Sequence, residues 1–275
     1  MKKRSKSRYS IINTLFYGIL SAISIILLYF LVRVFVADQF PVNTQSMSPT
    51  IKPGDRIVVN KLIFGPRIYK SLDFSSDKGL KSFRIKGYRG IRHNDIIVFN
   101  FPYSKNWSKV SFKINYVYTK RCIGLPGDSL SIINGFYRNN HFSDTLGCYP
   151  NQLVLSNSYM DSIDSGILKA FPYMSEYIHW NIKSFGPLYI PKSGDLLKIS
   201  IENLKLYKVL IEYETGKKLK VIDGCLYLGI KPLSYYKFTK NYYFVGGDNV
   251  MNSSDSRYFG LVPEEFIVGV VGWII

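Results

Sequence analysis

The sequence predicts a mainly β protein, in which a single N-terminal transmembrane helix precedes an antiparallel β domain with an irregular, β-rich insertion. Three observations lead to this prediction. Residues 9–32 contain no charged side chain. A turn motif followed by a β-rich run occurs four times further along the chain. Residues 134–190 are rich in Tyr and Ser and follow no regular apolar period.

The apolar N-terminal run predicts a membrane anchor, because residues 11–32 alone can cross a hydrocarbon core of about 30 Å. Five basic residues in front of it favour a cytoplasmic N-terminus: Lys2, Lys3, Arg4, Lys6 and Arg8. A cleaved signal peptide has a shorter apolar core of about 7–15 residues, and Ala37-Asp38-Gln39 is a poor cleavage site. We therefore expect a cytoplasmic tail at 1–10, a retained anchor at 11–36, and a domain on the outer face of the cytoplasmic (inner) membrane.

Four turn motifs organise the exported part of the chain. In each motif Gly or Asn supplies a positive φ and Asp bonds its own backbone, so a tight turn should start a strand. The motifs are KPGDRIVV (52–59), RHNDIIVF (92–99), LPGDSLSI (125–132) and KSGDLLKI (192–199). Further strands are expected at 114–123, 219–228, 241–246 and 266–275, and the last of these should be buried.

One helix is predicted outside the anchor, at 201–214. Its apolar side chains recur at helical spacing: Leu206, Tyr207, Leu210 and Ile211. These elements divide the exported part into a first core segment at 37–133, an insertion at 134–240 and a closing core segment at 241–275.

The net charge of +17 is compatible with nucleic acid, anionic lipid or a solvated surface as a partner. Nucleic-acid binding is disfavoured, because most basic residues follow the predicted anchor and lie on the exported side. The three cysteines cannot form a full disulfide framework, and the sequence leaves a Cys148–Cys225 pair open. No Cys and His cluster has metal-ligand spacing, so we expect neither a metal nor another cofactor.

The segment NTQSMSPTIK (43–52), which follows the anchor, presents Ser46 as a candidate nucleophile. Such a serine needs a base and donors for an oxyanion. The three histidines, His93, His141 and His179, stand in no setting that suggests a triad. Lysine can act as base only when neutral, and burial can lower its pKa by up to about 3–5 units. Lys120 in the apolar stretch NYVYTKRCIG (115–124) is the candidate, although lysines at strand ends are usually solvated.

A third segment, GGDNVMNSSDSRYFGLVP (246–263), is dense in short polar side chains. A polar loop between two strands is the simplest interpretation of this composition. A pair between Asp255 and Arg257 would also suit a rigid support for a site.

Together these segments resemble the type I signal peptidase family, also called bacterial leader peptidases, which are serine proteases with a Ser/Lys dyad. The motifs SMSPTI, GDRIVVNK, KRCIGLPGD and GDNVMNSSDSRYFGLVP stand in that family's order and roughly its spacing. RHNDIIVFNFP (92–102) resembles the family's intervening strand. The resemblance covers most of 40–130 and 242–272, whereas 134–240 lies outside these motifs.

The resemblance implies a catalytic role for each matching residue. Ser46 would be the nucleophile and Lys120 the neutral general base. The backbone N–H of Ser46 and the hydroxyl of Thr44 would hold the oxyanion. Ser253 would hydrogen-bond and orient Lys120. Asp255 and Arg257 would brace the site as an ion pair.

The resemblance also implies a membrane-anchored serine endopeptidase that removes signal peptides from exported preproteins, with no cofactor. Cleavage would follow small residues in sites of the Ala-X-Ala type. The substrate-binding residues would be Phe40, Val42, Met47, Ile51, Ile57, Tyr118 and Thr119. The phospholipid bilayer would be a second partner, and neither nucleic acid nor a metal is implied. Val250 departs from the arginine common in the family's GDNR motif, which puts a surface contact in doubt.

Two other classes of protein compete with this interpretation. A self-cleaving Ser/Lys peptidase of the repressor type is soluble and carries a DNA-binding module, and the anchor and the absence of a helix-turn-helix pattern argue against it. An inactive, anchored homologue could act as a scaffold. The presence of Ser46, Lys120, Ser253 and Asp255 argues against lost activity.

Overall fold

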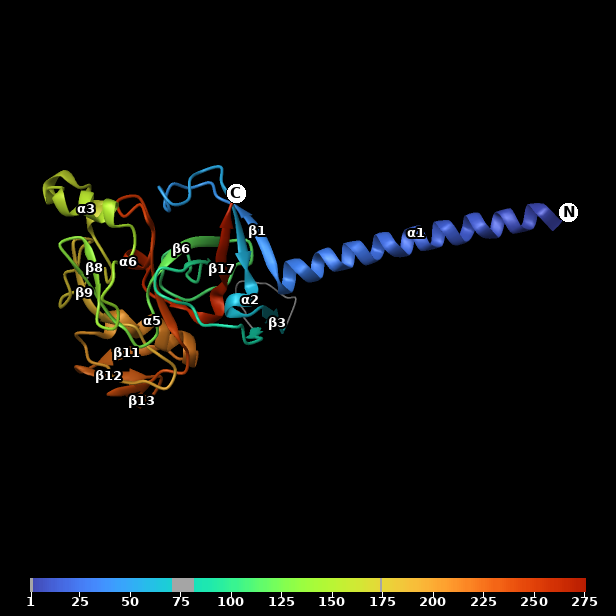
Figure 1. Cartoon of the computed structure of the whole chain (residues 1–275). Coiled ribbons are helices and arrows are strands. Elements are labelled where there is room, and N and C mark those ends of the chain that lie inside the picture. Colours follow the sequence, from blue (N-terminus) through green and yellow to red (C-terminus); the bar gives the residue numbers. More distant parts are fainter. Residues whose placement is uncertain (1, 71–81, 174) are drawn as a thin grey trace.

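A single long helix projects from a β-rich body (Figure 1). The computed structural model describes residues 2–70, 82–173 and 175–275. The helix is α1 (Lys2–Phe35), and within it residues 12–35 have a mean hydropathy of 2.4 and are not buried by the rest of the chain. Of the helices in the described ranges, this one alone is long and apolar enough to cross a membrane, as expected for the predicted anchor.

A seven-stranded antiparallel sheet forms the part of the body next to α1 (Figure 1). Its strands come from both ends of the chain, in the order β1 (Ala37–Pro41), β2 (Arg56–Asn60), β17 (Ile267–Ile274), β5 (Ile96–Asn100), β6 (Val117–Gly124), β15 (Tyr242–Gly246) and β16 (Val262–Pro263). Ile57 and Val59 on β2 are fully buried, as the alternation of side chains on a strand with one core-facing side requires. The segment after β1 lies near β6 because its Met47 and Ile51 share a core cluster with Val98 of β5 and Val117 of β6.

All four turn motifs start a strand, as predicted: β2, β5, β7 (Ser129–Ile133) and β10 (Leu196–Lys198). The residue before each Asp has a positive φ: Gly54, Asn94, Gly127 and Gly194. The hydrogen bond of the Asp differs from expectation. Each carboxylate accepts from the backbone N–H three residues earlier, at 2.7 to 2.8 Å, so it closes the turn from its C-terminal side.

The remaining strands form small sheets around the main one. The pair β3 (Arg67–Tyr69) and β4 (Ser82–Arg84) lies near α1 (Figure 1). The insertion holds β8 (Phe136–Asn139) and β9 (Ser184–Tyr189) with β7, β14 (Tyr235–Lys237) with β10, and the sheet of β11 (Leu219–Ile222), β12 (Cys225–Leu228) and β13 (Lys231–Pro232). Its apolar side chains share one core with Phe244 of β15 and Tyr258, so the insertion packs directly on the closing segment.

The predicted helix is confirmed as α5 (Leu204–Thr215), and its four apolar positions are buried. The expectation of one helix was incomplete. The insertion also contains α3 (Tyr149–Asn157), and three four-residue helices occur: α2 (Lys61–Phe64), α4 (Ser165–Leu168) and α6 (Ser256–Phe259). Two single-turn 3₁₀ helices complete the described part of the chain: η2 (Met160–Ser162) and η3 (Glu264–Phe266).

Two strand predictions need correction. Residues 219–228 are a hairpin of β11 and β12, because Asp223 and Gly224 both have positive φ and reverse the chain. The final strand is buried only in its first half. Trp273 and Ile274 remain 64% and 43% exposed, because they extend to the end of the sheet beside β2.

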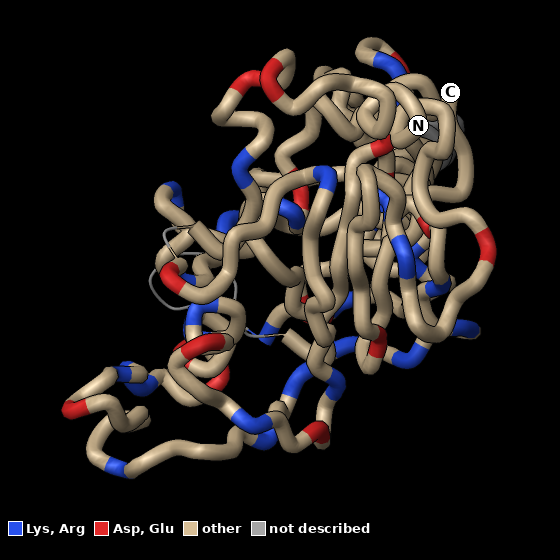
Figure 2. The backbone as a smooth tube through the Cα atoms, turned by 90° about the vertical axis from the view of Figure 1, so that its left-hand side faces the viewer, with Lys and Arg blue, Asp and Glu red and all other residues tan. Residues whose placement is uncertain are grey.

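Charged residues are not concentrated on the face drawn in Figure 2. Lys and Arg are spread along loops on several sides of that face, with acidic residues among them. Cys122, Cys148 and Cys225 are all free thiols, so the pair that the sequence left open is not formed.

Candidate active site

Ser46 and Lys120 meet although 74 positions separate them in the chain. The Nζ of Lys120 donates a hydrogen bond to the Oγ of Ser46 at 2.5 Å. Lys120 lies on β6, opposite Ile97 of β5, and its side chain is only 4% exposed. Ser46 lies in the loop after β1 and is 9% exposed. The sheet therefore holds a buried amine against a serine hydroxyl.

Burial is the main reason why the pKa of Lys120 is lowered to about 8. An ammonium loses hydration in a buried site, so the neutral amine is favoured. Asp255 and Asp248 oppose this shift and Arg257 adds to it. A substantial fraction of Lys120 is therefore neutral slightly above neutral pH, which a general base requires.

Two donors for a developing negative charge lie beside the serine. The backbone N–H of Ser46 has no hydrogen-bond partner within the described ranges. The Oγ1 of Thr44 lies 3.4 Å from the Oγ of Ser46. The carbonyl of Ser46 is held instead by the backbone N–H of Asn249 at 3.1 Å. This contact fixes the serine loop while leaving the Ser46 N–H free to donate.

Asp255 and Arg257 form a fully buried, bidentate ion pair, with both N–O distances at 2.8 Å. Asp255 also caps α6 through the N–H of Arg257 and accepts from the N–H of Gly247 at 2.9 Å. Burial alone would raise the pKa of the Asp255 carboxyl, but the charge of Arg257 together with the hydrogen bonds from Arg257 and the Gly247 N–H lowers that pKa. The pair thus ties the loop behind the serine to the end of β15.

The expected hydrogen bond from Ser253 to Lys120 is absent. The hydroxyl of Ser253 is buried and has no hydrogen-bond partner among the residues that the structure describes. It packs instead against Gly247, where a Cβ would lie 2.0 Å from Ser253 Oγ and 2.6 Å from the carbonyl oxygen of Ser46. Only glycine fits at 247, because the Ser46 loop and Ser253 close on its backbone from both sides.

A second ion pair beside the site was not predicted. Successive side chains on a strand point to opposite faces, so Arg121, next to Lys120 on β6, does not point toward Ser46. Arg121 instead binds Asp248 through two hydrogen bonds of 2.6 and 2.7 Å, and Thr50 donates to the same carboxylate at 2.5 Å. Asn151 of α3 donates to the carbonyls of Asp248 and Ser48. The only sequence signal for this cluster was the alternation along β6.

A cavity of about 500 Å³ opens over the pair of Ser46 and Lys120. Four predicted substrate-binding residues line it: Val42, Met47, Tyr118 and Thr119. The other three lie elsewhere, and their role in substrate binding stays a prediction. Ile51 and Ile57 do not line it and are fully buried in the core behind Met47, and Phe40 lines a different cavity near α1. Further residues that line the cavity were not predicted: Pro41, Asn43, Gln45, Tyr116, Val117, Asn252 and Ser254.

The histidines lie outside this site, as expected. His93 and His141 both contact the carboxylate of Asp128, at 2.7 and 3.2 Å. Within the part of the chain that the structure describes, no group of three or more His, Cys, Asp or Glu residues is arranged to hold a metal ion. Val250, at the position of the family's arginine, is 1% exposed and belongs to the core.

One known protein family matches most of this chain. The family model of signal peptidase, peptidase S26, matches residues 15–181 and 190–275, which include every residue of the pair and its supports. This chain belongs to the signal peptidase family. Signal peptidases remove signal peptides from exported preproteins, so the chain is a peptidase with preproteins as substrates, and α1 suggests that it is anchored in a membrane.

Its relatives carry the same family name. Signal peptidase I of Buchnera aphidicola subsp. Baizongia pistaciae is 30% identical over 91% of this chain and 73% of its own length. Signal peptidase I of Helicobacter pylori is 28% identical over 90% of this chain and 78% of its own length. A crystal structure of a signal peptidase I from Enterococcus faecalis, at 20% identity, covers 66% of this chain and 97% of its own, with a TM-score of 0.30.

Proposed function

We propose that this signal peptidase cleaves preproteins with Ser46 as nucleophile and neutral Lys120 as general base. The observation that carries the proposal is the 2.5 Å contact between Lys120 Nζ and Ser46 Oγ in a buried site. The lowered pKa of Lys120 supports the same assignment, because an activated serine needs a base that is neutral at working pH.

The reaction takes place in two stages. Lys120 takes the hydroxyl proton as Ser46 Oγ attacks the scissile carbonyl carbon, and the oxyanion accepts hydrogen bonds from the Ser46 N–H and the Thr44 hydroxyl. The ammonium of Lys120 then protonates the leaving amine, which departs as the mature protein. Water attacks the acyl-enzyme with Lys120 again as base, and Ser46 is regenerated. Asp255 and Arg257 act as positioning residues through Gly247.

Specificity for small residues at the first and third positions before the cut follows from the apolar wall of the cavity. Val42, Met47, Tyr118 and Thr119 line the cavity beside Ser46, and we expect them to accept the small side chains of Ala-X-Ala sites and to exclude large ones. A preprotein would lie extended along the first half of β6, residues 117–120, which pairs with β5 but not with β15 and can therefore accept an added strand.

We also propose that α1 spans the cytoplasmic (inner) membrane once, with its N-terminus in the cytoplasm. The basic residues before the apolar run support this direction. The dyad then lies on the outer face, where the cleavage site of an exported preprotein emerges.

The direct test is cleavage of a preprotein with an Ala-X-Ala site by the variants Ser46→Ala and Lys120→Ala. Each should lose at least about a thousandfold in kcat, as loss of a nucleophile or its base does. Ser108→Ala and Lys109→Ala serve as matched controls, because both residues are exposed and neither lines the cavity. Full activity of either dyad variant would reject the mechanism.

A further inference from the structure

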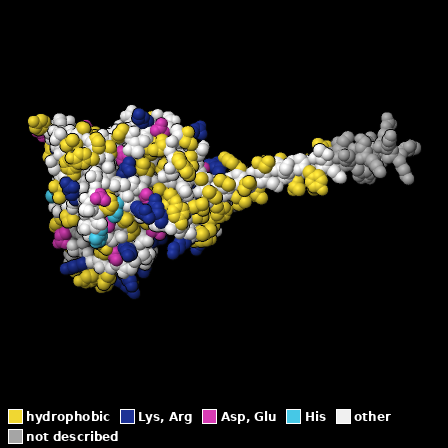
Figure 3. Space-filling view, viewed as in Figure 1, with side chains coloured by type: hydrophobic (Ala, Val, Ile, Leu, Met, Phe, Trp, Pro, Cys, Tyr) yellow, Lys and Arg dark blue, Asp and Glu magenta, His cyan; other side chains and the backbone are white. Residues whose placement is uncertain are grey.

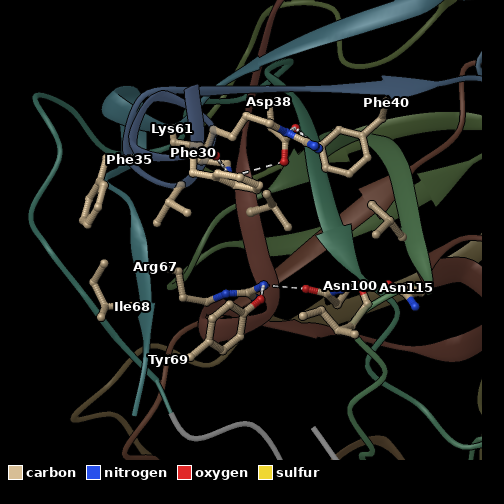
Figure 4. Close-up of a pocket in the computed structure, with 15 residues that line it drawn as sticks. Phe30, Phe35, Asp38, Phe40, Lys61, Arg67, Ile68, Tyr69, Asn100 and Asn115 are labelled. Atoms are coloured by element: carbon tan, nitrogen blue, oxygen red, sulfur yellow. Dashed lines mark hydrogen bonds and ion pairs between the residues drawn. The ribbon is translucent and has the colours of Figure 1, made fainter. Parts of the chain in front are cut away.

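A second cavity of about 590 Å³ lies where the end of α1 meets the β domain (Figure 4). Val117 lines both this cavity and the one over Ser46. The apolar part of its wall comes from α1, β1, β3 and the central sheet: Phe30, Val34, Phe35, Phe40, Ile68 and Val268. We call it the junction cavity.

Arg67 of β3 crosses one side of the junction cavity toward Asn100 (Figure 4). It is 8% exposed, and its terminal nitrogens donate to the carbonyl of Glu265, the hydroxyl of Tyr69 and the amide oxygen of Asn100. All these acceptors are neutral, and no described residue accepts a hydrogen bond from its Nε–H. Arg67 therefore lacks an anionic partner within the described ranges. A buried guanidinium is costly unless an anion compensates its charge, so an anion bound here would stabilise it.

The opposite side of the junction cavity holds further positive charge. Lys61 donates to the carbonyl of Arg33 at 2.5 Å and lies 3.5 Å from the carboxylate of Asp38. Arg33 pairs with that carboxylate at 2.6 Å. Asp38, the single acid among the described residues that line the cavity, is thus shared by two cations. Three cations face one carboxylate, which leaves an excess of positive charge around an otherwise apolar space.

The position of the junction cavity favours a lipid as the source of the missing anion. The apolar span of α1 ends at Phe35, so the cavity lies at the level where lipid headgroups meet the hydrocarbon core. Figure 3 shows hydrophobic side chains gathered where α1 joins the body, with Lys and Arg beside them. A phosphodiester and the upper part of an acyl chain match this combination of charge and apolar wall.

We propose that the junction cavity binds one membrane phospholipid, with its phosphate against Arg67 and Lys61 and an acyl chain along Phe30 and Val34. This goes beyond the peptidase reaction and rests only on the proposed insertion of α1 in a membrane. A bound lipid would hold the β domain at a fixed angle to α1, and thus hold Ser46 at a fixed height above the bilayer.

The test uses the full chain purified in dodecyl maltoside and titrated with phosphatidylglycerol, with retained lipid counted by native mass spectrometry. The unaltered chain and Ser46→Ala should each retain one lipid. Arg67→Gln and Lys61→Gln should each bind it at least tenfold more weakly. Arg56→Gln is the matched control, because Arg56 is exposed on β2 and does not line the cavity. The partly exposed Lys61 provides a variant that should fold even if Arg67→Gln does not, and thermal unfolding checks both.

Three results would overturn the proposal. The first is equal lipid retention by the unaltered chain, Arg67→Gln and Lys61→Gln. The second is complete displacement by inorganic phosphate or glycerol phosphate at millimolar concentration, which would indicate an anion site without a lipid. The third is displacement of the lipid by a synthetic signal peptide, which would assign the cavity to substrate. Since Ser46→Ala should still bind lipid, failure here is distinct from failure of the proposed dyad.

Discussion

Gly247 shows how a single residue can position the nucleophile. A Cβ at this position would lie 2.0 Å from Ser253 Oγ and 2.6 Å from the Ser46 carbonyl oxygen, so the serine loop would have to move. We expect Gly247→Ala to lower kcat by at least about a hundredfold, because a displacement near 1 Å can cost that much. Gly90→Ala is the control, since a Cβ at Gly90 meets nothing within 4 Å. Equal peptide cleavage by both variants would contradict this role.

The individual residues that could be predicted from the sequence are reactive or charged side chains within short sequence motifs. Ser46, Lys120, Asp255 and Arg257 were found in this way, and the structure brings them together. The contact between Thr50 and Asp248 joins positions 198 apart, and no local pattern reports it. The same holds for the close approach at Gly247, because a glycine in a polar loop usually indicates only a turn.

The element with the least expected role is α3 in the insertion. Asn151 reaches out of this helix and donates to the carbonyls of Ser48 and Asp248, at 3.1 and 2.7 Å. It thereby joins the insertion to the serine loop. We expect Asn151→Ala to lower kcat roughly tenfold with little change in KM, because about one hydrogen bond that positions the loop is lost.

Asn157→Ala provides the control for α3, since Asn157 is an exposed residue of the same helix. Activity and the temperature of unfolding should be measured together. If Asn151→Ala and Asn157→Ala cleave a peptide at the same rate, α3 does not support the serine loop.

The elements differ in how well the sequence reports them. The four turn motifs and α5 were predictable, because turn chemistry and helical spacing are local. Helix α3 was missed because it has no side-chain cap and only two of its residues, Gln152 and Leu155, are buried, so its sequence has no apolar helical period. The hairpin of β11 and β12 could have been found from Asp223-Gly224, which is a strong turn signal between two β-rich runs.

The orientation of the whole molecule in the membrane can be tested by labelling a native cysteine. Cys225 is exposed on β12, whereas Cys122 is buried. In a Cys148→Ala background, we expect a membrane-impermeant maleimide to label Cys225 from the outer side of intact spheroplasts. A Ser7→Cys substitution in a chain that lacks both Cys148 and Cys225 should be labelled only after permeabilisation. The reverse pattern would contradict the proposed topology.

The central claim, that a buried and neutral Lys120 activates Ser46, is tested most directly by the pH dependence of kcat/KM. The pKa of Lys120 is lowered to about 8, mainly by burial, so only about one tenth of it is neutral at pH 7. We expect kcat/KM for an Ala-X-Ala peptide to rise about tenfold per pH unit below pH 8 and to level off above it. His93→Gln should leave this profile unchanged. A flat profile from pH 6 to 10, or a rise near pH 6.5 that His93→Gln abolishes, would contradict the lysine base.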